Sequence, residues 1–357
     1  MSAEASVAAG AESAPPFLRN LWYMAAPARS LKRGQLRRHM LLGEPVLLGR
    51  MGDGTAFALR DICPHRGVPL SGGRVMAENT VECPYHGWRF RADGVCTLIP
   101  SLVEGQDIDP AKIRVRSYPV REQDGLIWLY FASDERKPPS PSVEPPRVGI
   151  PDPMPRWVES QTFHCGIDHA VIGLMDPAHA PYVHGRWWWK KAPRVKEKAY
   201  APLPMGFVMS RHAPTKPAYK FLGGDVSTEI TFELPSVRFE NIRGTVMGRQ
   251  IDVVGFTACT PIDADTTQVT QVFYWPAWLS FLKPLFMLLG PVFLTDDRKM
   301  AELQREGLKF NPNLMLIQDS DVPAMWYHRL KKAWAHSVET GAPFANPIQP
   351  RTLRWRS

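Results

Sequence analysis

The chain has 357 residues, 44% of them hydrophobic, and a formal net charge of +8 from 43 Lys and Arg against 35 Asp and Glu. This composition excludes a disordered chain and provides for about two folded domains. The basic residues are scattered, so a solvated basic surface, or a docking face for an acidic electron-transfer protein, is favoured over nucleic-acid binding. Five cysteines in a chain of this length do not form a disulfide framework.

The first part of the chain predicts three segments. Residues 1–16 are rich in Ala, Ser and Glu and have no signal-peptide pattern, so we expect a disordered tail on a cytoplasmic protein. Residues 17–137 carry short β segments separated by turn signals such as Asp53-Gly54, which predicts a compact all-β domain. Residues 138–155 contain eight prolines and are expected to be a linker, because proline fixes φ and removes a backbone donor.

Residues 156–357 are predicted to form a second domain of the α+β class, with an antiparallel sheet flanked by helices. Helices are expected around residues 166–186, 297–308 and 323–337. Strands are predicted at 206–211, 226–234, 243–247, 251–260 and 268–275, following those at 45–49, 56–59 and 126–131 in the first domain.

Two loops of the first domain, each flanked by Pro and Gly, hold one cysteine and one histidine apiece. Cys63 and His65 form a C-x-H pair, and after seventeen residues Cys83 and His86 form a C-x-x-H pair. Two thiolates and two imidazoles fit either a structural zinc site or a [2Fe–2S] cluster in which two histidines bind one iron. The cluster is favoured, because zinc fingers place both cysteines in one knuckle and both histidines on a later helix.

The loop sequences CPHRG and CPYHGW resemble those of Rieske domains. The segments FLRNLWYMAAPA and GVCTLIP are similar to the oxygenase components of Rieske non-heme iron enzymes, in particular the vanillate-demethylase-like group of the aromatic ring-hydroxylating family. The resemblance implies that Cys63 and Cys83 hold one iron of the cluster while His65 and His86 hold the other. Buried free thiols are expected at the three other cysteines, Cys96, Cys165 and Cys259.

The second domain contains a further candidate metal motif in the segment DPAHAPYVH, which begins at Asp176. Taken alone, His179 and His184 do not share a helix face, although Pro177 and Pro181 should disturb the helix and could bring the two rings together. A helix-terminal histidine without metal is the alternative. D-x-x-H-x4-H resembles the catalytic iron motif of the same family, in which two histidines and a later carboxylate form a facial triad. The resemblance implies that both histidines bind iron and that Asp176 bridges to a Rieske histidine of the neighbouring subunit.

The third iron ligand is expected in the segment LTDDRKMAELQ, which looks like the acidic segment that starts a helix in this family. Asp297 takes the ligand position and Asp296 is the next candidate, the alternative being N-terminal helix charges favoured by the helix dipole. One departure from the family is Gly173, where many relatives carry Asn. The roles in substrate or O2 positioning that depend on that amide are therefore not expected in this chain. His164 and His169 match no motif and are interpreted as structural, with a pocket-lining role for His169 as the alternative.

Residues 275–294 form an apolar segment with one charge in twenty residues. Its length would allow a transmembrane helix, but three prolines and Lys283 argue against one. A buried helix or pocket wall is favoured, and contact with a membrane surface is less favoured. The tryptophans at 187–189 either line the pocket of the proposed iron site or only pack against other side chains.

The sequence therefore predicts the terminal oxygenase of a multicomponent Rieske system, with a [2Fe–2S] cluster and a mononuclear non-heme Fe(II). The expected reaction is O2- and NAD(P)H-dependent monooxygenation, a demethylation or a hydroxylation, of an aromatic or other apolar small molecule. No nicotinamide-binding G-x-G-x-x-G and no plant-type ferredoxin motif is present, so electrons are expected from a separate reductase, with or without a ferredoxin. The family resemblance implies a head-to-tail homotrimer. Alternatives are a Rieske oxygenase acting on a polycyclic or sterol-like lipid, a non-catalytic Rieske electron carrier, and a zinc-binding interaction protein.

Overall fold

The structure is a computed structural model that describes residues 16–184, 194–214, 225–246 and 248–357. The predicted tail, apart from Pro16, and the tryptophans at 187–189 lie outside the described residues. The chain forms two compact units, Arg19–Arg147 and Val148–Ser357, and the described residues before Arg19 group with the second.

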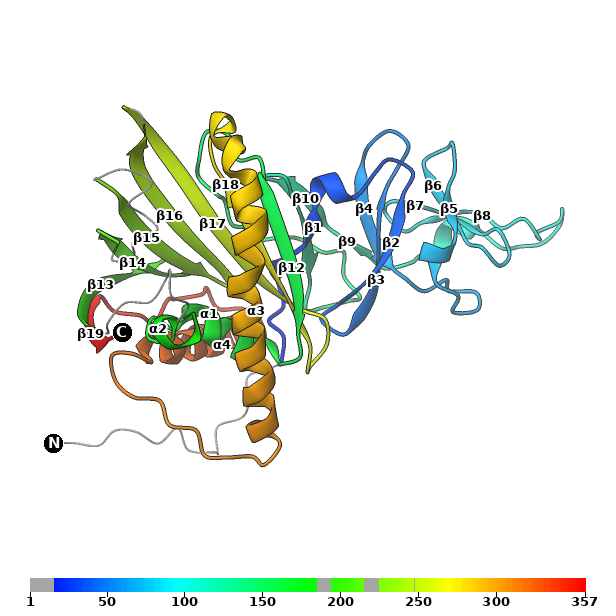
Figure 1. Cartoon of the computed structure of the whole chain (residues 1–357). Coiled ribbons are helices and arrows are strands. Elements are labelled where there is room, and N and C mark those ends of the chain that lie inside the picture. Colours follow the sequence, from blue (N-terminus) through cyan, green and yellow to red (C-terminus); the bar gives the residue numbers. More distant parts are fainter. Residues whose placement is uncertain (1–15, 185–193, 215–224, 247) are drawn as a thin grey trace. The chain divides into compact units, whose positions relative to one another are not determined.

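The first unit consists of three small antiparallel sheets, with strand orders β1-β11-β10, β2-β3-β4-β9 and β5-β6-β7-β8 (Figure 1). Its strands are β1 (Leu21–Pro27), β2 (Leu36–Leu41), β3 (Glu44–Arg50), β4 (Ala56–Arg60), β5 (Arg74–Val75), β6 (Thr80–Glu82), β7 (Arg89–Arg91), β8 (Cys96–Leu98), β9 (Ser117–Tyr118), β10 (Val120–Gln123) and β11 (Leu126–Phe131). Three short 3-10 turns connect them, namely η1 (Ala28–Ser30), η2 (Leu70–Gly72) and η3 (Pro110–Lys112). The all-β prediction for this part of the chain is confirmed.

The proline-rich segment 138–155 contains no helix and no strand. Its first part packs on the first unit, where the carbonyl of Val143 accepts a hydrogen bond from Trp22 Nε1 at 2.7 Å. The side-chain amide of Gln123 donates to the carbonyl of Pro146 at 2.8 Å. The division between the two units falls just after these contacts.

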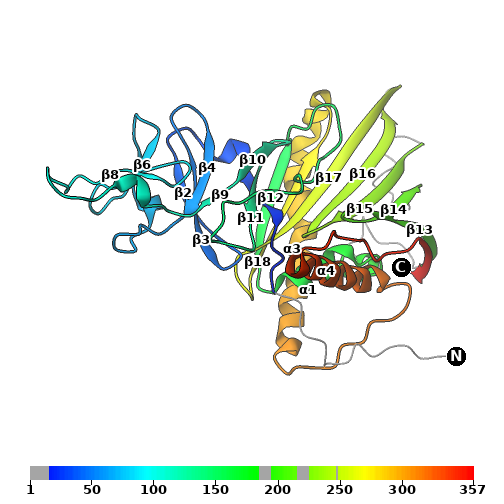
Figure 2. The same ribbon diagram turned by 180° about the vertical axis from the view of Figure 1, so that it is seen from behind.

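The second unit is built on one eight-stranded antiparallel sheet in the order β12-β18-β17-β16-β15-β14-β13-β19 (Figures 1 and 2). Its strands are β12 (Trp157–Phe163), β13 (Val195–Leu203), β14 (Gly206–His212), β15 (Ser227–Glu233), β16 (Val237–Val246), β17 (Arg249–Pro261), β18 (Thr267–Tyr274) and β19 (Arg351–Arg356). Its helices are α1 (Ile167–Met175), α2 (Ala180–Val183), the 3-10 helix η5 (Ala277–Leu282), α3 (Lys283–Leu308) and α4 (Val322–Thr340). The predicted α+β class with an antiparallel sheet is confirmed.

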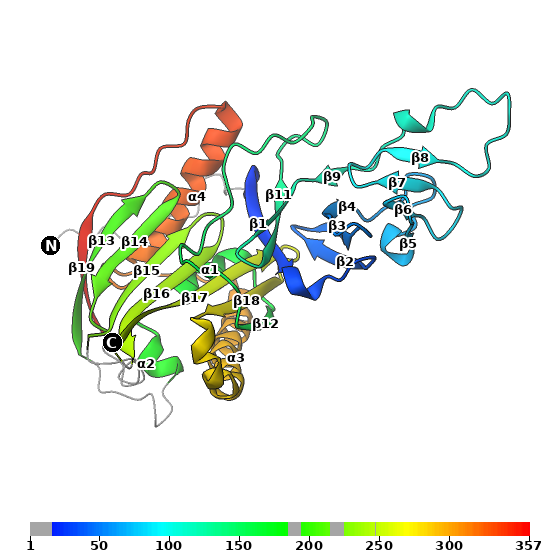
Figure 3. The same ribbon diagram turned by 90° about the horizontal axis from the view of Figure 1, so that it is seen from above.

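Helices α3 and α4 cover the same face of this sheet. Trp326 of α4 packs on Phe207 of β14 with ring centroids 5.3 Å apart, and Gln161 of β12 donates a hydrogen bond to α3. The strand register aligns one row of side chains on this face: Phe207, Phe232, Arg238, Thr257, Gln271 and Glu159. Because alternate residues of a strand share a face, Glu159 and Gln161 point to the same side. Seen from above, α3 lies beside β12 and β18 while α4 lies beside β13 to β15 (Figure 3).

Helix α3 begins well before the predicted start at Asp297. It runs through Pro284, which stands in the first turn where a missing N–H costs little, and through Pro291 in its interior. Asp296 and Asp297 therefore lie in the middle of α3, so their interpretation as N-terminal helix charges, and the expectation that a helix starts there, are wrong.

The apolar segment 275–294 forms η5 and the first part of α3, with one side buried and one side exposed. Leu279 is 2% and Leu294 is 5% exposed, whereas Phe281 is 68% and Leu288 is 72% exposed. Within the described residues, no helix combines the length and the apolar character needed to span a membrane.

Candidate metal centres

The two loops that hold the predicted cluster ligands have the same backbone geometry. Cys63 follows β4, and Cys83 lies between β6 and β7. In each loop the cysteine N–H donates to the carbonyl five residues later, at 2.9 and 2.8 Å, and a glycine N–H returns to the cysteine carbonyl, at 2.9 Å from Gly67 and 3.2 Å from Gly87. Both glycines are left-handed, with φ of +70° and +69°, a conformation that glycine adopts without strain.

These loops carry buried thiols and exposed imidazoles. Cys63 and Cys83 are 2% and 3% exposed. The rings of His65 and His86 are exposed and their centroids lie 4.5 Å apart, so the four predicted donors gather where the two loops meet. The indole of Trp88 stacks on His65 with a centroid distance of 4.8 Å and thereby supports one imidazole.

The chemistry of this donor set fits a metal cluster. Burial raises the pKa of the Cys63 thiol to about 11, and the neighbouring Cys83 thiol acts in the same direction. Such a thiol keeps its proton at neutral pH unless a metal replaces it. Two thiolates and two imidazoles are the ligands of a Rieske cluster, in which the histidines share one iron.

Asp61, which no sequence motif marks, holds the start of the first loop in place. Its side chain is buried and accepts two hydrogen bonds from Ser71, from the backbone N–H at 2.7 Å and from the hydroxyl at 2.6 Å. A buried carboxylate with two donors holds this part of the backbone in place. In the sequence, Asp61 could have been recognised only as an acidic residue two positions before a ligand cysteine.

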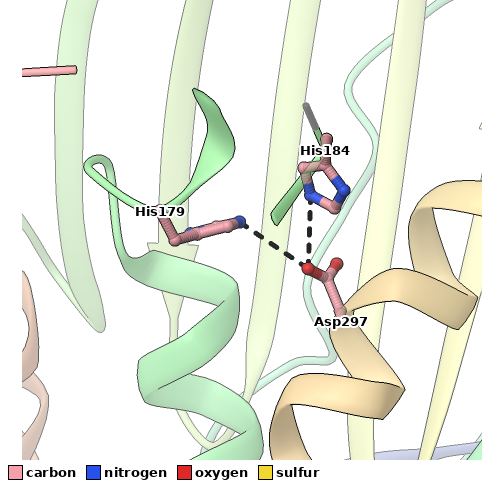
Figure 4. A group of neighbouring side chains, drawn as sticks. All are labelled: His179, His184 and Asp297. Atoms are coloured by element: carbon pink, nitrogen blue, oxygen red, sulfur yellow. Dashed lines mark ion pairs between the residues drawn. The ribbon is translucent and has the colours of Figure 1, made fainter. Parts of the chain in front are cut away.

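Three side chains of the second unit converge on one point (Figure 4). The ligand atoms of His179, His184 and Asp297 all lie within 4.8 Å of one another. His184 Nε2 is 3.2 Å and His179 Nε2 is 3.7 Å from the same oxygen, Oδ1 of Asp297. In the described part of the chain no other three His, Cys, Asp or Glu side chains meet in this way.

Prolines shape the backbone that presents the two histidines. Helix α1 ends at Met175, and His179 and His184 flank the four-residue helix α2. A continuous helix would place residues five apart about 140° around its axis. The interruption instead brings the two imidazole rings to a centroid distance of 5.3 Å, as the prolines lead us to expect.

Asp176 orients His179 mainly through its backbone. Its carbonyl oxygen accepts a hydrogen bond from His179 Nδ1 at 2.9 Å, and its Oδ2 lies 3.5 Å from the same nitrogen. Burial alone would raise the pKa of the Asp176 carboxyl, but hydrogen bonds from His179 and from the N–H of Ala178 outweigh it and hold that pKa below its usual value. Because a carbonyl only accepts, Nδ1 is the protonated nitrogen, which leaves Nε2 with the lone pair that a metal requires.

Two imidazoles and one carboxylate are the donor set of facial-triad iron sites, which keep coordination positions open. The convergence of the Nε2 atoms on Asp297 Oδ1 fits one metal ion at this point.

Cys259 of β17 lies close by on the helix-covered face of the sheet. Burial raises the pKa of its thiol, and the neighbouring Cys165 and Asp297 act in the same direction. All five cysteines are free and buried.

Neither of the two other histidines considered from the sequence belongs to the group of three converging side chains. His164 is exposed, and His169 of α1 lies near His328 of α4, where burial lowers the pKa of both imidazoles. A Cβ at Gly173 would meet no atom within 4 Å, so a side chain could begin at this position without a clash. Phe293, which the sequence analysis does not single out, contacts the His184 ring edge-on with centroids 5.1 Å apart.

Residues 21–119 match the family model of the Rieske [2Fe–2S] domain. This part of the chain is a Rieske domain. The chain is 39% identical over 175 residues to the oxygenase component of dicamba O-demethylase from Stenotrophomonas maltophilia, which covers 47% of this chain and 48% of that protein. It is 34% identical over 171 residues to an iron-sulfur subunit of the toluene-4-sulfonate monooxygenase system from Comamonas testosteroni, covering 47% of each protein.

The Rieske domain is followed by a second unit whose fold is also known. A crystal structure of dicamba monooxygenase bound to dicamba matches 91% of this chain and 99% of that chain, with a TM-score of 0.71 and 25% identity. The sequence matches span about half the length of the curated relatives, whereas the structural match spans nearly all of dicamba monooxygenase. The predicted resemblance to the oxygenase components of Rieske non-heme iron enzymes is confirmed.

Proposed function

We propose that the chain is the terminal oxygenase of a multicomponent Rieske system. One observation carries this proposal: in the unit that follows the Rieske domain, two histidine Nε2 atoms converge on one carboxylate oxygen of Asp297. A Rieske electron carrier has no use for such a second site, which argues against the non-catalytic alternative.

In this proposal, Cys63 and Cys83 hold one iron of the cluster, and His65 and His86 hold the other. The exposure of both imidazoles leaves the histidine side of the cluster open to an electron partner. The burial of both cysteines keeps water away from the thiolates, which protects the cluster from hydrolysis.

His179, His184 and Asp297 hold the mononuclear iron. When bound, the two metal groups supply one-electron transfer and O2 activation, chemistry that protein side chains lack. The chain's own residues orient His179 through the Asp176 carbonyl and bury His184 to 7% exposure, so that the two ring nitrogens keep their positions. We further propose that the Asp176 carboxylate bridges to a Rieske histidine of a neighbouring subunit in a head-to-tail homotrimer.

The proposed reaction is O2- and NAD(P)H-dependent monooxygenation, as demethylation or hydroxylation, of an aromatic or other apolar small molecule. Two relatives support it: one is a demethylase component and one belongs to a monooxygenase system, both named for aromatic compounds. A separate reductase, with or without a ferredoxin, would deliver the electrons, and we expect the protein in the cytoplasm.

Anaerobic reconstitution with iron and sulfide tests this proposal. We expect the visible absorption and the reduced-state EPR signal of a Rieske cluster, together with a second ferrous site that forms an EPR-active nitrosyl adduct. A protein with the cluster and no nitrosyl adduct would be an electron carrier. A protein that binds only zinc would be neither.

A further inference from the structure

One face of helix α3 surrounds the imidazole of His184. Phe293, Asp296 and Asp297 are spaced i, i+3 and i+4 along α3, so they project to the same side of the helix. Phe293 meets the ring edge-on at 5.1 Å, Asp297 Oδ1 lies 3.2 Å from Nε2, and Asp296 Oδ2 lies 3.8 Å from Nδ1. The two consecutive aspartates therefore face the two different nitrogens of one ring.

The Nδ1 atoms of the two site histidines have different surroundings. His179 Nδ1 is hydrogen-bonded to the Asp176 carbonyl at 2.9 Å. His184 Nδ1 is buried and has no hydrogen-bond partner in the described part of the chain, and the oxygen of Asp296 is the charged group that faces it. A buried N–H without an acceptor is destabilising, so this nitrogen needs an acceptor when the ring binds metal through Nε2.

Helix α3 is seated firmly enough to hold this acceptor in place. The side-chain amide of Gln161 in β12 donates to Thr295 Oγ1 at 3.0 Å, next to Asp296. Five residues before Thr295, Gly290 lies so close to β12 that an added Cβ would stand 2.6 Å from the indole of Trp157. The Asp296 side chain is 13% exposed, against 38% for Asp297, so it is the more buried of the two carboxylates.

We propose that Asp296 is a positioning residue for the iron site, whose carboxylate accepts the Nδ1–H of His184. The inference rests on the proposed function, because it gives Asp296 a task only if His184 binds a metal. The separation of 3.8 Å is longer than a hydrogen bond, so the carboxylate must close on the ring when metal binds Nε2. This bond would hold His184 in the tautomer with a free Nε2 and make that nitrogen a stronger ligand. Asp296 is then the counterpart, on His184, of the Asp176 carbonyl on His179.

The test is the rate at which Fe(II) leaves the reconstituted full-length protein when a ferrous chelator is added under anaerobic conditions. Asp296→Ala removes the acceptor, whereas Asp296→Asn keeps an oxygen of similar position. We expect the Ala variant to lose its mononuclear iron about 10–100-fold faster than the unaltered protein and the Asn variant to stay within a few-fold. The nitrosyl EPR signal should broaden or split in the Ala variant, because His184 is less well oriented, and should be restored by Asn.

Glu302→Gln provides a matched control on the same helix, because Glu302 is 43% exposed and lies 3.7 Å from Arg298. It should release iron at the unaltered rate, and the Rieske absorption should be the same in all variants. An Ala variant with an unaltered release rate and nitrosyl signal overturns the inference, as does an Asn variant as impaired as Ala. An Ala variant without iron even at saturating Fe(II) makes Asp296 a direct ligand and also overturns it. If the unaltered protein binds no mononuclear iron, the proposed function itself fails.

Discussion

The ammonium group of Lys331 in α4 is buried and lies 2.7 and 2.8 Å from the two carboxylate oxygens of Asp168 in α1. The hydroxyl of Tyr327 donates a third hydrogen bond to the same carboxylate at 2.7 Å. This cluster ties the start of α1 to α4, and the other end of α1 leads directly into Asp176 and the iron-site histidines. Removing Lys331 leaves the Asp168 carboxylate, whose side chain is 34% exposed, without its cation.

Because water can partly solvate the remaining Asp168 carboxylate, Lys331→Met should lower the free energy of unfolding by about 2 kcal/mol. The measurement is denaturant unfolding followed by circular dichroism, with the Rieske absorption reporting on the first unit separately. Lys309→Met is the matched control, since Lys309 makes an equally short pair with Glu306 at 2.7 Å but is exposed. That control should cost less than about 1 kcal/mol. Equal effects of the two substitutions would contradict a structural role for the buried pair.

Cys63→Ser and Cys83→Ser should each abolish the visible absorption and EPR signal of the cluster, because each removes a thiolate ligand. Cys96→Ala is the control within the same core, since Cys96 is 1% exposed but matches no ligand motif. It should keep the full Rieske spectrum. An intact spectrum in either ligand variant would be incompatible with the cluster assignment.

Asp297→Ala should lower the bound iron from about three to about two atoms per chain, because the mononuclear site loses its carboxylate while the cluster keeps its two irons. Bound iron is measured by equilibrium dialysis against Fe(II), with the Rieske absorption as an internal reference. At saturating Fe(II), Asp296→Ala should still hold about three atoms. The reverse pattern would move the ligand role from Asp297 to Asp296.

Asp176→Asn should keep both metal groups and lose most turnover. The backbone carbonyl of residue 176, not the carboxylate, holds His179 Nδ1 at hydrogen-bond distance, so the substitution leaves that imidazole in place. In single-turnover mixing we expect a reduced cluster that fails to reoxidise in the presence of substrate and O2. Normal turnover, or full activity of a strict monomer, would rule out the bridging role. Loss of the mononuclear iron would instead make Asp176 a ligand.

The exposed apolar side chains of the segment 275–294 make it possible to test whether this segment only lines the site or contacts a membrane surface. If the segment only walls the site, the purified protein should stay in solution without detergent and should not sediment with liposomes. Phe281→Ser with Leu288→Ser removes two of the exposed side chains and serves as the comparison. Sedimentation of the unaltered protein that disappears in this double variant would favour membrane-surface contact and a lipid-like substrate.

The sequence alone was sufficient for features whose parts lie close together in the chain. The Cys63/His65 and Cys83/His86 loops each hold their ligand types within a few residues, and left-handed glycines close both turns. The two histidines around α2 are recognisable for the same reason. The sheet class also follows from local patterns, because β-rich segments such as 268–275 match β18 to within a residue.

Pairings between distant segments needed the tertiary structure. Residues 351–356, RTLRWR, form β19 and pair with β13. Only Leu353 and Trp355 in this segment show the alternation of apolar and polar residues that is typical of a strand. Adjacent helix residues point about 100° apart, so the rotation of α3 decides whether Asp296 or Asp297 meets the Nε2 atoms of the histidines. The close packing of Gly290 on Trp157 restricts that rotation. These two residues lie more than a hundred positions apart in the chain, so no local sequence pattern specifies their contact.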